Sequence, residues 1–202
     1  MPLWIASQPL VLASKSDIRG KILAAAGLRF GIRPAQLDER AIEAKAGPLD
    51  AIAAAQLLAR VKADSVARKH SGSLVLGADQ TLEIGGERFS KPADRAQAVA
   101  QLRRLRGNTH ALHSALALVQ DGEVLFEWVD TARLTMRDFS DRFLDNYLDM
   151  AGEAALSSVG GYQLEGLGIH LFERVEGDHF TILGLPLLPL LSFLRRNGFL
   201  DG

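Results

Sequence analysis

The most constraining feature of the sequence is an acidic side chain, Asp79, at the end of an apolar segment. Residues 74–79 read Leu-Val-Leu-Gly-Ala-Asp, and a short, continuous apolar run of this kind is typical of a buried strand. A buried carboxylate without a partner loses its hydration at high cost. The sequence therefore predicts that Asp79 meets a metal ion, a Lys or Arg side chain, or several hydrogen-bond donors.

A lysine follows Asp79 at a spacing that a tight turn can close. Gly85 and Gly86 predict a reversal of the chain that folds residues 87–91, ending in Lys91, back beside the same strand. An acid and a base brought together in this way suit phosphate chemistry, in which a metal ion and a lysine offset negative charge.

Strand-like and helix-like segments alternate along the chain, but hairpins interrupt the alternation. Asp121 and Gly122 give one hairpin signal, and the Gly85–Gly86 pair gives another. This order predicts an α/β fold with a mixed central sheet rather than a purely parallel one. We expect strands at residues 10–13, 29–33, 74–84, 87–89, 110–119, 123–134 and 169–175, helices at residues 17–26, 49–69, 93–106, 141–150 and 186–197, and a polar loop with one helical turn at residues 36–47.

Composition narrows the class of protein. The chain has 202 residues, of which 48% are hydrophobic and 23% charged, which favours one globular domain over residues 1–202, with two lobes around a cleft as an option. The formal net charge is −1, whereas a protein that binds nucleic acid usually has an excess of Lys and Arg. Cysteine is absent, which excludes disulfides and thiolate zinc sites.

The apolar segments do not suggest a membrane protein. The first residues lack the basic and apolar regions of a signal peptide. The most apolar run, residues 181–194, is short and is broken by Gly184, Pro186 and Pro189, so it does not suit a membrane span. It predicts a buried strand followed by a core helix. We expect a cytoplasmic protein with no membrane partner.

A candidate phosphate site lies where the first strand meets the first helix. Ser14 and Ser16 follow the strand, and Arg19 stands in the first turn of the helix. A helix N-terminus offers free N–H groups and the positive end of a dipole, and an arginine adds a bidentate contact. The same residues also suit a simple N-cap with a surface arginine, and their spacing does not decide between the two.

Three further charged residues could belong to a binding site, and each also has an ordinary structural interpretation. Glu39 lies in a polar loop that could reach a metal or simply carry solvated charges. Lys62 lies on the long alanine-rich helix, where a lysine usually extends its charge to solvent. Glu165 lies in the glycine-rich segment 160–168, where the backbone can approach a ligand closely or merely turn.

In their order along the chain, these pieces resemble the Maf family of nucleotide pyrophosphatases. The family opens with Leu-Ala-Ser-x-Ser-Pro-Arg-Arg, where this chain has Leu-Ala-Ser-Lys-Ser-Asp-Ile-Arg at residues 12–19. Its Gly-x-Asp-Gln strand matches residues 77–80. Its Lys-Pro pair and the following Leu-x-x-Leu-x-Gly-x-x-His element match residues 91–92 and 102–110, and its late glycine motifs match residues 166–168 and 184–187. The match spans nearly the whole chain.

The resemblance implies a fold and an activity. It implies an elongated Maf/Ham1-like (ITPase-like) α/β fold with a mixed central sheet, flanking helices and a central cleft, and commonly a homodimer. It implies hydrolysis of a nucleoside triphosphate to the monophosphate and pyrophosphate with a divalent metal, Mg²⁺ or Mn²⁺. By position, Asp79, Lys91 and Lys62 match its catalytic residues, Glu39 and Asp79 its metal residues, and Ser14, Ile18, Arg19, Gln80 and Glu165 its substrate-binding residues.

The identity of the base stays open at this stage. Gln80 after Asp79, together with Glu165, is similar to the branch of the family that accepts 7-methyl-GTP rather than dTTP or UTP. Departures from the family pattern include Asp17 for a proline, Ser114-Ala115 for the usual Thr-Gly, and Ile18 where that branch usually has an aromatic residue. A flat ring stacks on a base and isoleucine does not.

Two other functions are compatible with the same residues. One is a phosphohydrolase that acts on another nucleotide or on a sugar phosphate, which would release orthophosphate instead of pyrophosphate. The other is a nucleotide-binding regulator of cell division, since the family has been linked to septum formation.

Overall fold

The computed structural model describes residues 3–202. A seven-stranded mixed sheet forms the centre, with the strand order β2-β1-β3-β5-β6-β7 and with β4 paired to β3. β1 is parallel to both of its neighbours, and the other pairings are antiparallel. The predicted α/β fold with a mixed sheet is therefore confirmed. The strands are β1 (Leu10–Leu12), β2 (Phe30–Ile32), β3 (Val75–Ile84), β4 (Glu87–Phe89), β5 (Thr109–Gln120), β6 (Glu123–Met136) and β7 (Phe172–Glu176).

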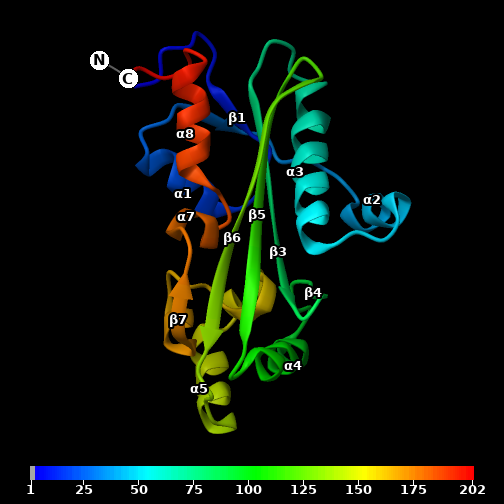
Figure 1. Ribbon diagram of the computed structural model, residues 1–202, viewed down its shortest axis with the longest axis vertical. Coiled ribbons are helices and arrows are strands. Elements are labelled where there is room, and N and C mark those ends of the chain that lie inside the picture. Colours follow the sequence, from blue (N-terminus) through cyan, green and yellow to red (C-terminus); the bar gives the residue numbers. More distant parts are fainter. Residues whose placement is uncertain (1–2) are drawn as a thin grey trace.

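Helices cover both faces of the sheet. Figure 1 shows three long strands, β3, β5 and β6, running along the molecule, with α3 on one side and α1, α7 and α8 on the other. α4 and α5 lie at the opposite end from the chain termini (Figure 1). The helices are α1 (Asp17–Ala25), α2 (Glu39–Ala46), α3 (Ala51–Ala67), α4 (Arg95–Leu105), α5 (Asp141–Ala151), α6 (Ala154–Ser157), α7 (His179–Ile182) and α8 (Leu187–Arg196), with short 3-10 helices at Val159–Gly161 and Leu167–Leu171. None of the helices in residues 3–202 is long and apolar enough to cross a membrane.

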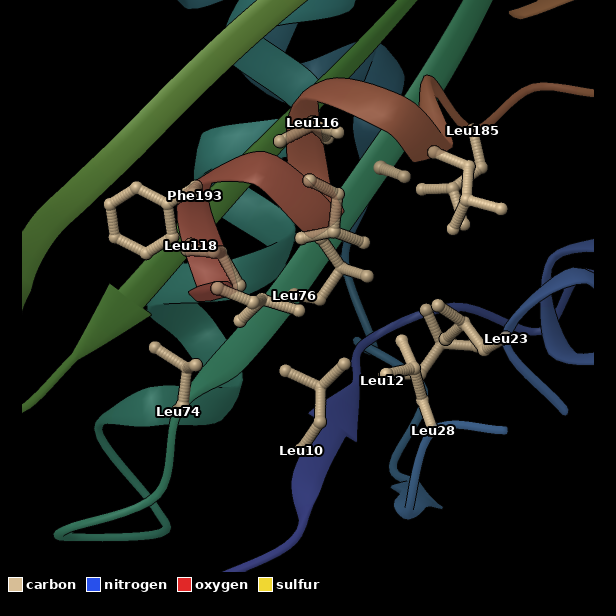
Figure 2. Close-up of a cluster of buried hydrophobic side chains, with 14 of the residues drawn as sticks. Leu10, Leu12, Leu23, Leu28, Leu74, Leu76, Leu116, Leu118, Leu185 and Phe193 are labelled. Atoms are coloured by element: carbon tan, nitrogen blue, oxygen red, sulfur yellow. The ribbon is translucent and has the colours of Figure 1, made fainter. Parts of the chain in front are cut away.

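Separate hydrophobic clusters stabilise the two ends of the long strands. At the β1 end, leucines of β1, β3 and β5 pack against α1 and α8, as Figure 2 shows for Leu12, Leu76, Leu116 and Phe193 among others. The other end has its own cluster, in which β5 and β6 pack against α4 and α5. A third cluster, rich in alanine and valine, joins α3 to the sheet. The sheet's middle therefore lies between the two end clusters.

Three predicted segments differ from the structure. Residues 36–47 were expected to form a polar loop with one helical turn, but they hold a two-turn helix, α2, because the Asp38 carboxylate accepts a hydrogen bond from the Ala41 N–H and caps it. The strand expected at the start of residues 181–194 is wrong. The Asp178 carboxylate caps the short helix α7 by accepting from the Thr181 N–H, which overrides the apolar, β-branched pattern. Residues 169–171 belong to a 3-10 helix, so β7 begins only at Phe172.

One histidine packed among the residues at the α4 and α5 end of the sheet should make the free energy of unfolding depend on pH. His110 on β5 is 2% exposed, its Nε2 lies 2.6 Å from the Tyr162 hydroxyl oxygen, and its Nδ1 has no hydrogen-bond partner. Burial lowers the pKa of His110 from 6.5 to about 4. The imidazole is therefore neutral in the folded protein at pH values where the unfolded chain already binds a proton.

We predict that His110 lowers the free energy of unfolding as the pH falls from about 6.5 to about 4. The folded pKa lies below the unfolded one, so the contribution is complete above the unfolded pKa and is lost down to the folded pKa. The full span corresponds to about 3 kcal/mol. Urea unfolding at several pH values should show a shallower acid slope for His110→Gln than for the parent; equal slopes would contradict the prediction.

Candidate active site

The candidate site lies at a gap on one edge of β3. That edge pairs with β1 at Val75 and Leu76 and with β4 from Leu82 to Ile84, which leaves residues 77–81 free of a strand partner on that side. Asp79 lies in the middle of this gap. Ligand sites in α/β proteins commonly form where a sheet edge opens in this way.

A close approach between α3 and β3 brings a lysine to Asp79. A Cβ atom on Gly77 would collide with the Ala59 carbonyl oxygen and lie 2.7 Å from the Ala63 nitrogen, so only glycine allows the helix to pack this near. Asp79 lies two residues further along β3 and therefore faces α3 as well. Lys62, beside Ala63, donates from Nζ to the Asp79 Oδ1 at 2.6 Å.

Lys62 is a bridge between two carboxylates. Its Nζ also lies 2.9 Å from the Glu39 Oε1, on α2. The Lys62 and Asp79 side chains are 12% and 11% exposed, whereas Glu39 is 47% exposed. The interpretation of Lys62 as a surface lysine is therefore wrong: the ammonium group is held between two carboxylates that line the cleft.

The charges around Asp79 oppose the effect of burial. Burial raises the pKa of the Asp79 carboxyl above its usual range, while the positive charges of Lys62 and Arg19 act to lower it. A carboxylate with a raised pKa is a better proton acceptor near neutral pH than an exposed one. Burial correspondingly lowers the pKa of Arg19, and the nearby Asp79 acts to raise it.

Arg19 is a buried cation held by neutral groups. It is 9% exposed, and its Nε donates to the Gly184 carbonyl oxygen at 2.8 Å. One terminal nitrogen, Nη1, donates to the Ala78 carbonyl oxygen at 2.8 Å and to the Ser14 Oγ at 3.1 Å. Arg19 makes no salt bridge with an acid among residues 3–202, so its charge is available to an anion in the cleft.

The turn before α1 differs in detail from the prediction. Ser16 occupies the N-cap position, but its hydroxyl makes no capping hydrogen bond. The Ser14 Oγ instead accepts a hydrogen bond from the Ser16 N–H at 3.2 Å. Ser14 therefore orders the turn and contacts Arg19 at the same time, and the arginine is not the surface residue that the plainer interpretation required.

The orientation of the Gln80 amide is determined by its surroundings. Its Nε2 donates to the carbonyl oxygens of Thr181 and Ile182, at 3.1 and 2.9 Å, and lies 2.9 Å from the Ser114 Oγ. A flipped amide would place its oxygen against two carbonyl oxygens. The amide nitrogen is therefore used inside the protein, and the Gln80 Oε1 is left to accept a hydrogen bond from a ligand.

All of the predicted site residues line one cleft, of about 1500 Å³, but they do not all touch. Lys91 and Glu165 are exposed at its rim. The expected pairing of Asp79 with Lys91 is wrong, because Lys62 is the partner of Asp79, and Lys91 makes no ion pair among the described residues. β4 does fold back beside β3, as predicted. Ile18 is half-buried in the cleft wall.

Several contributing residues were missed from the sequence. Ser114 and Thr181 are fully buried and hold the Gln80 amide, and Gly184 supports Arg19. Glu43 and Arg88 form an ion pair in the cleft wall. The unusual Ser114-Ala115 pair and the motif at residues 184–187, which contains Gly184, were the signals available; Thr181, Glu43 and Arg88 come from segments predicted to be strand or loop.

The donor set for a metal ion is small. No group of three or more His, Asp or Glu side chains that could hold a metal occurs among residues 3–202. The carboxylates of Glu39 and Asp79 converge on the same Lys62 ammonium group. Two carboxylates suit Mg²⁺, which is usually held by one or two such groups, substrate phosphates and water.

Comparison with known proteins decides the family. The family model described as Maf-like protein matches residues 9–197. This chain belongs to the Maf family. It is 58% identical over 197 residues, 98% of both chains, to a nucleoside triphosphate pyrophosphatase of Bradyrhizobium diazoefficiens. It is 52% identical to a 7-methyl-GTP pyrophosphatase of Rhizobium etli, over 96% of this chain and 98% of the relative. The predicted family is thus confirmed.

A more distant likeness exists among solved structures. A HAM1 protein from Coxiella burnetii superposes with a TM-score of 0.45 at 15% identity, over 64% of this chain and 73% of the other. This likeness is too weak to support a statement about the activity.

The close approach at Gly77 leads to a testable prediction. Gly77→Ala should destabilise the fold by several kcal/mol, because the added methyl group collides with helix backbone that cannot rotate away. It should also separate Lys62 from Asp79. Urea unfolding measures the first effect. Gly31→Ala is the matched control, because this strand glycine has open space around its Cβ position. Equal stability of the two variants would contradict the prediction.

Proposed function

We propose that this protein hydrolyses a nucleoside triphosphate to the nucleoside monophosphate and pyrophosphate. The observation that carries the proposal is the buried Asp79 carboxylate, 2.6 Å from Lys62, with the unpaired cation of Arg19 beside it in the same cleft. The names of the Bradyrhizobium and Rhizobium relatives support the reaction class.

Each group has a role that its position suits. Asp79 orients a water molecule toward the α-phosphorus and accepts its proton. The bond from that phosphorus to the α–β bridging oxygen breaks, and pyrophosphate leaves with the bridging oxygen. Arg19, Lys62 and Lys91 balance the negative charge that shifts onto the leaving group. Arg19 is held in place before substrate arrives, so little reorganisation is needed at the moment of reaction.

We also propose that a divalent cation, Mg²⁺ or Mn²⁺, takes part. Glu39 and Asp79 would hold it, since their carboxylates already converge on one positive charge. A bound cation would neutralise phosphate oxygens and polarise the anhydride. Lys62, which now bridges the two carboxylates, would then turn toward the phosphates.

The base subsite favours a purine that offers hydrogen-bond donors. The Gln80 amide nitrogen is occupied by protein acceptors, which leaves its oxygen as the group that could meet a base, and the Glu165 carboxylate also accepts without donating. Guanine carries N–H donors on its Watson–Crick edge, whereas dTTP and UTP offer a single N–H there. A guanine-type or N7-methylated substrate therefore fits these acceptors, and the name of the Rhizobium relative is consistent with it.

We further propose a homodimer that works in the cytoplasm. The resemblance to the family supports the dimer, and the absence of cysteine is compatible with a reducing compartment. The near-zero net charge gives no reason to expect a nucleic acid as partner.

The activity is tested with a nucleotide panel. We predict that Mg²⁺ or Mn²⁺ supports release of pyrophosphate from at least one nucleoside triphosphate, and that excess EDTA abolishes it. Asp79→Asn should lower kcat by at least about 10²-fold, the usual contribution of a positioned acid or base. Far-ultraviolet circular dichroism checks that this variant is folded. Orthophosphate as the only product, or full activity in EDTA, would overturn the proposal.

The base preference is tested by exchanging the two acceptors. Gln80→Thr combined with Glu165→Gln should move the ratio of kcat/KM values toward dTTP and UTP and away from 7-methyl-GTP and GTP. The shift should be about 1–3 kcal/mol, because the rest of the subsite is unchanged. Glu165→Asp is the control that keeps an acceptor. A parent enzyme that already prefers dTTP and UTP would disprove this interpretation.

A further inference from the structure

The helix that carries Glu39 is weakly packed. No residue of α2 is buried, and only Ile42 and Glu43 are half-buried. Figure 1 shows α2 standing outside α3, away from the sheet. Apolar burial therefore contributes little to holding α2 at the cleft, although Glu39 is within 2.9 Å of Lys62.

Two side-chain ion pairs connect α2 to the cleft walls. The first joins Glu39 to Lys62. The second joins Glu43 to Arg88 on β4, with 2.6 Å between the Glu43 Oε2 and an Arg88 terminal nitrogen. Glu39 and Glu43 are four residues apart and so share one face of the helix. The Glu43 and Arg88 side chains are 29% and 31% exposed, so solvent screens this pair only partly.

The two pairs differ in their relation to the reacting groups. Lys62 also binds Asp79, and a triphosphate in the cleft attracts its ammonium group. The first pair is therefore weakened when substrate is present. Neither Glu43 nor Arg88 pairs with Lys62 or Asp79 among residues 3–202, so their ion pair does not depend on the Lys62 ammonium group. Arg88 also precedes Lys91 by three residues. The pair therefore links α2 to β4 and to the residues directly after it, which include Lys91.

We propose that the Glu43–Arg88 ion pair is a latch that holds α2, and with it Glu39, over the cleft, so that both are positioning residues for the reaction. The part that concerns catalysis rests on the proposed pyrophosphatase function. The latch also joins α2 to β4, two elements that α3 and β3 separate in the chain.

A charge-reversal cycle tests the latch. Glu43→Arg and Arg88→Glu should each lower kcat/KM for pyrophosphate release about tenfold and should speed amide hydrogen exchange in residues 39–46. The double variant should recover most of both losses, because the pair is restored in reverse. Arg60 and Glu127 are the matched control, a bidentate pair between α3 and β6 that does not line the cleft. The same reversals there should leave both readouts unchanged.

Two results would overturn the latch. One is unchanged exchange in residues 39–46 when Glu43 is replaced. The other is a double variant that stays as impaired as Arg88→Glu alone, which would mean that Arg88 touches the substrate directly. Failure of the parent enzyme to release pyrophosphate from any nucleotide would instead refute the proposed function, and the exchange rates would still decide whether the ion pair holds α2.

Discussion

The arrangement of the cleft depends on one steric constraint, the absence of a side chain at Gly77. Because α3 packs with backbone against the strand there, Lys62 reaches Asp79 with a short, direct hydrogen bond. Without this contact, the Asp79 carboxylate would be buried with only the more distant charge of Arg19 to balance it. Burying a charge that is poorly balanced costs a large free energy of desolvation. The ion pair and the close packing of helix on strand therefore support one another, and the same contact that stabilises the fold prepares the groups assigned to catalysis.

The general plan of the fold could be predicted from the sequence, because strong local signals agreed with one another. The glycine pair at residues 85–86 and the Asp121-Gly122 turn identified the hairpins, and the apolar run before Asp79 identified the central strand. Two of the errors came where a single capping side chain begins a helix in a segment expected to be loop or strand. Asp38 and Asp178 each begin a helix by accepting one backbone N–H, and no periodicity in the following residues announces it.

The membership of the site was easier to predict than its pairings. Asp79 was recognised as a buried acid that needed a cation, and Arg19 was placed at a helix start. Which lysine meets the acid was not predictable, because it depends on how closely α3 approaches β3. Gly77 sets this distance where it packs against Ala59 and Ala63 of the helix. The orientation of the Gln80 amide was hidden for a similar reason. Two of its three partners are main-chain carbonyl groups of α7, whose positions no side-chain motif reveals.

The turn that ends α7 supports two parts of the cleft at once. Its carbonyl groups accept hydrogen bonds from Gln80, on the side assigned to the base, and from Arg19, on the side assigned to the phosphates. Gly184 also lies close to both side chains. A Cβ atom placed on it would be 3.3 Å from an Arg19 terminal nitrogen and 3.7 Å from the Gln80 side chain. Divergence toward a new base by remodelling this wall would thus disturb the binding of phosphate, which every substrate shares. In the described part of the chain, the cleft-lining segment 157–165 makes no hydrogen bond with Arg19 or Gln80. Substitutions in this segment would therefore alter contacts with the base while leaving the support of Arg19 intact.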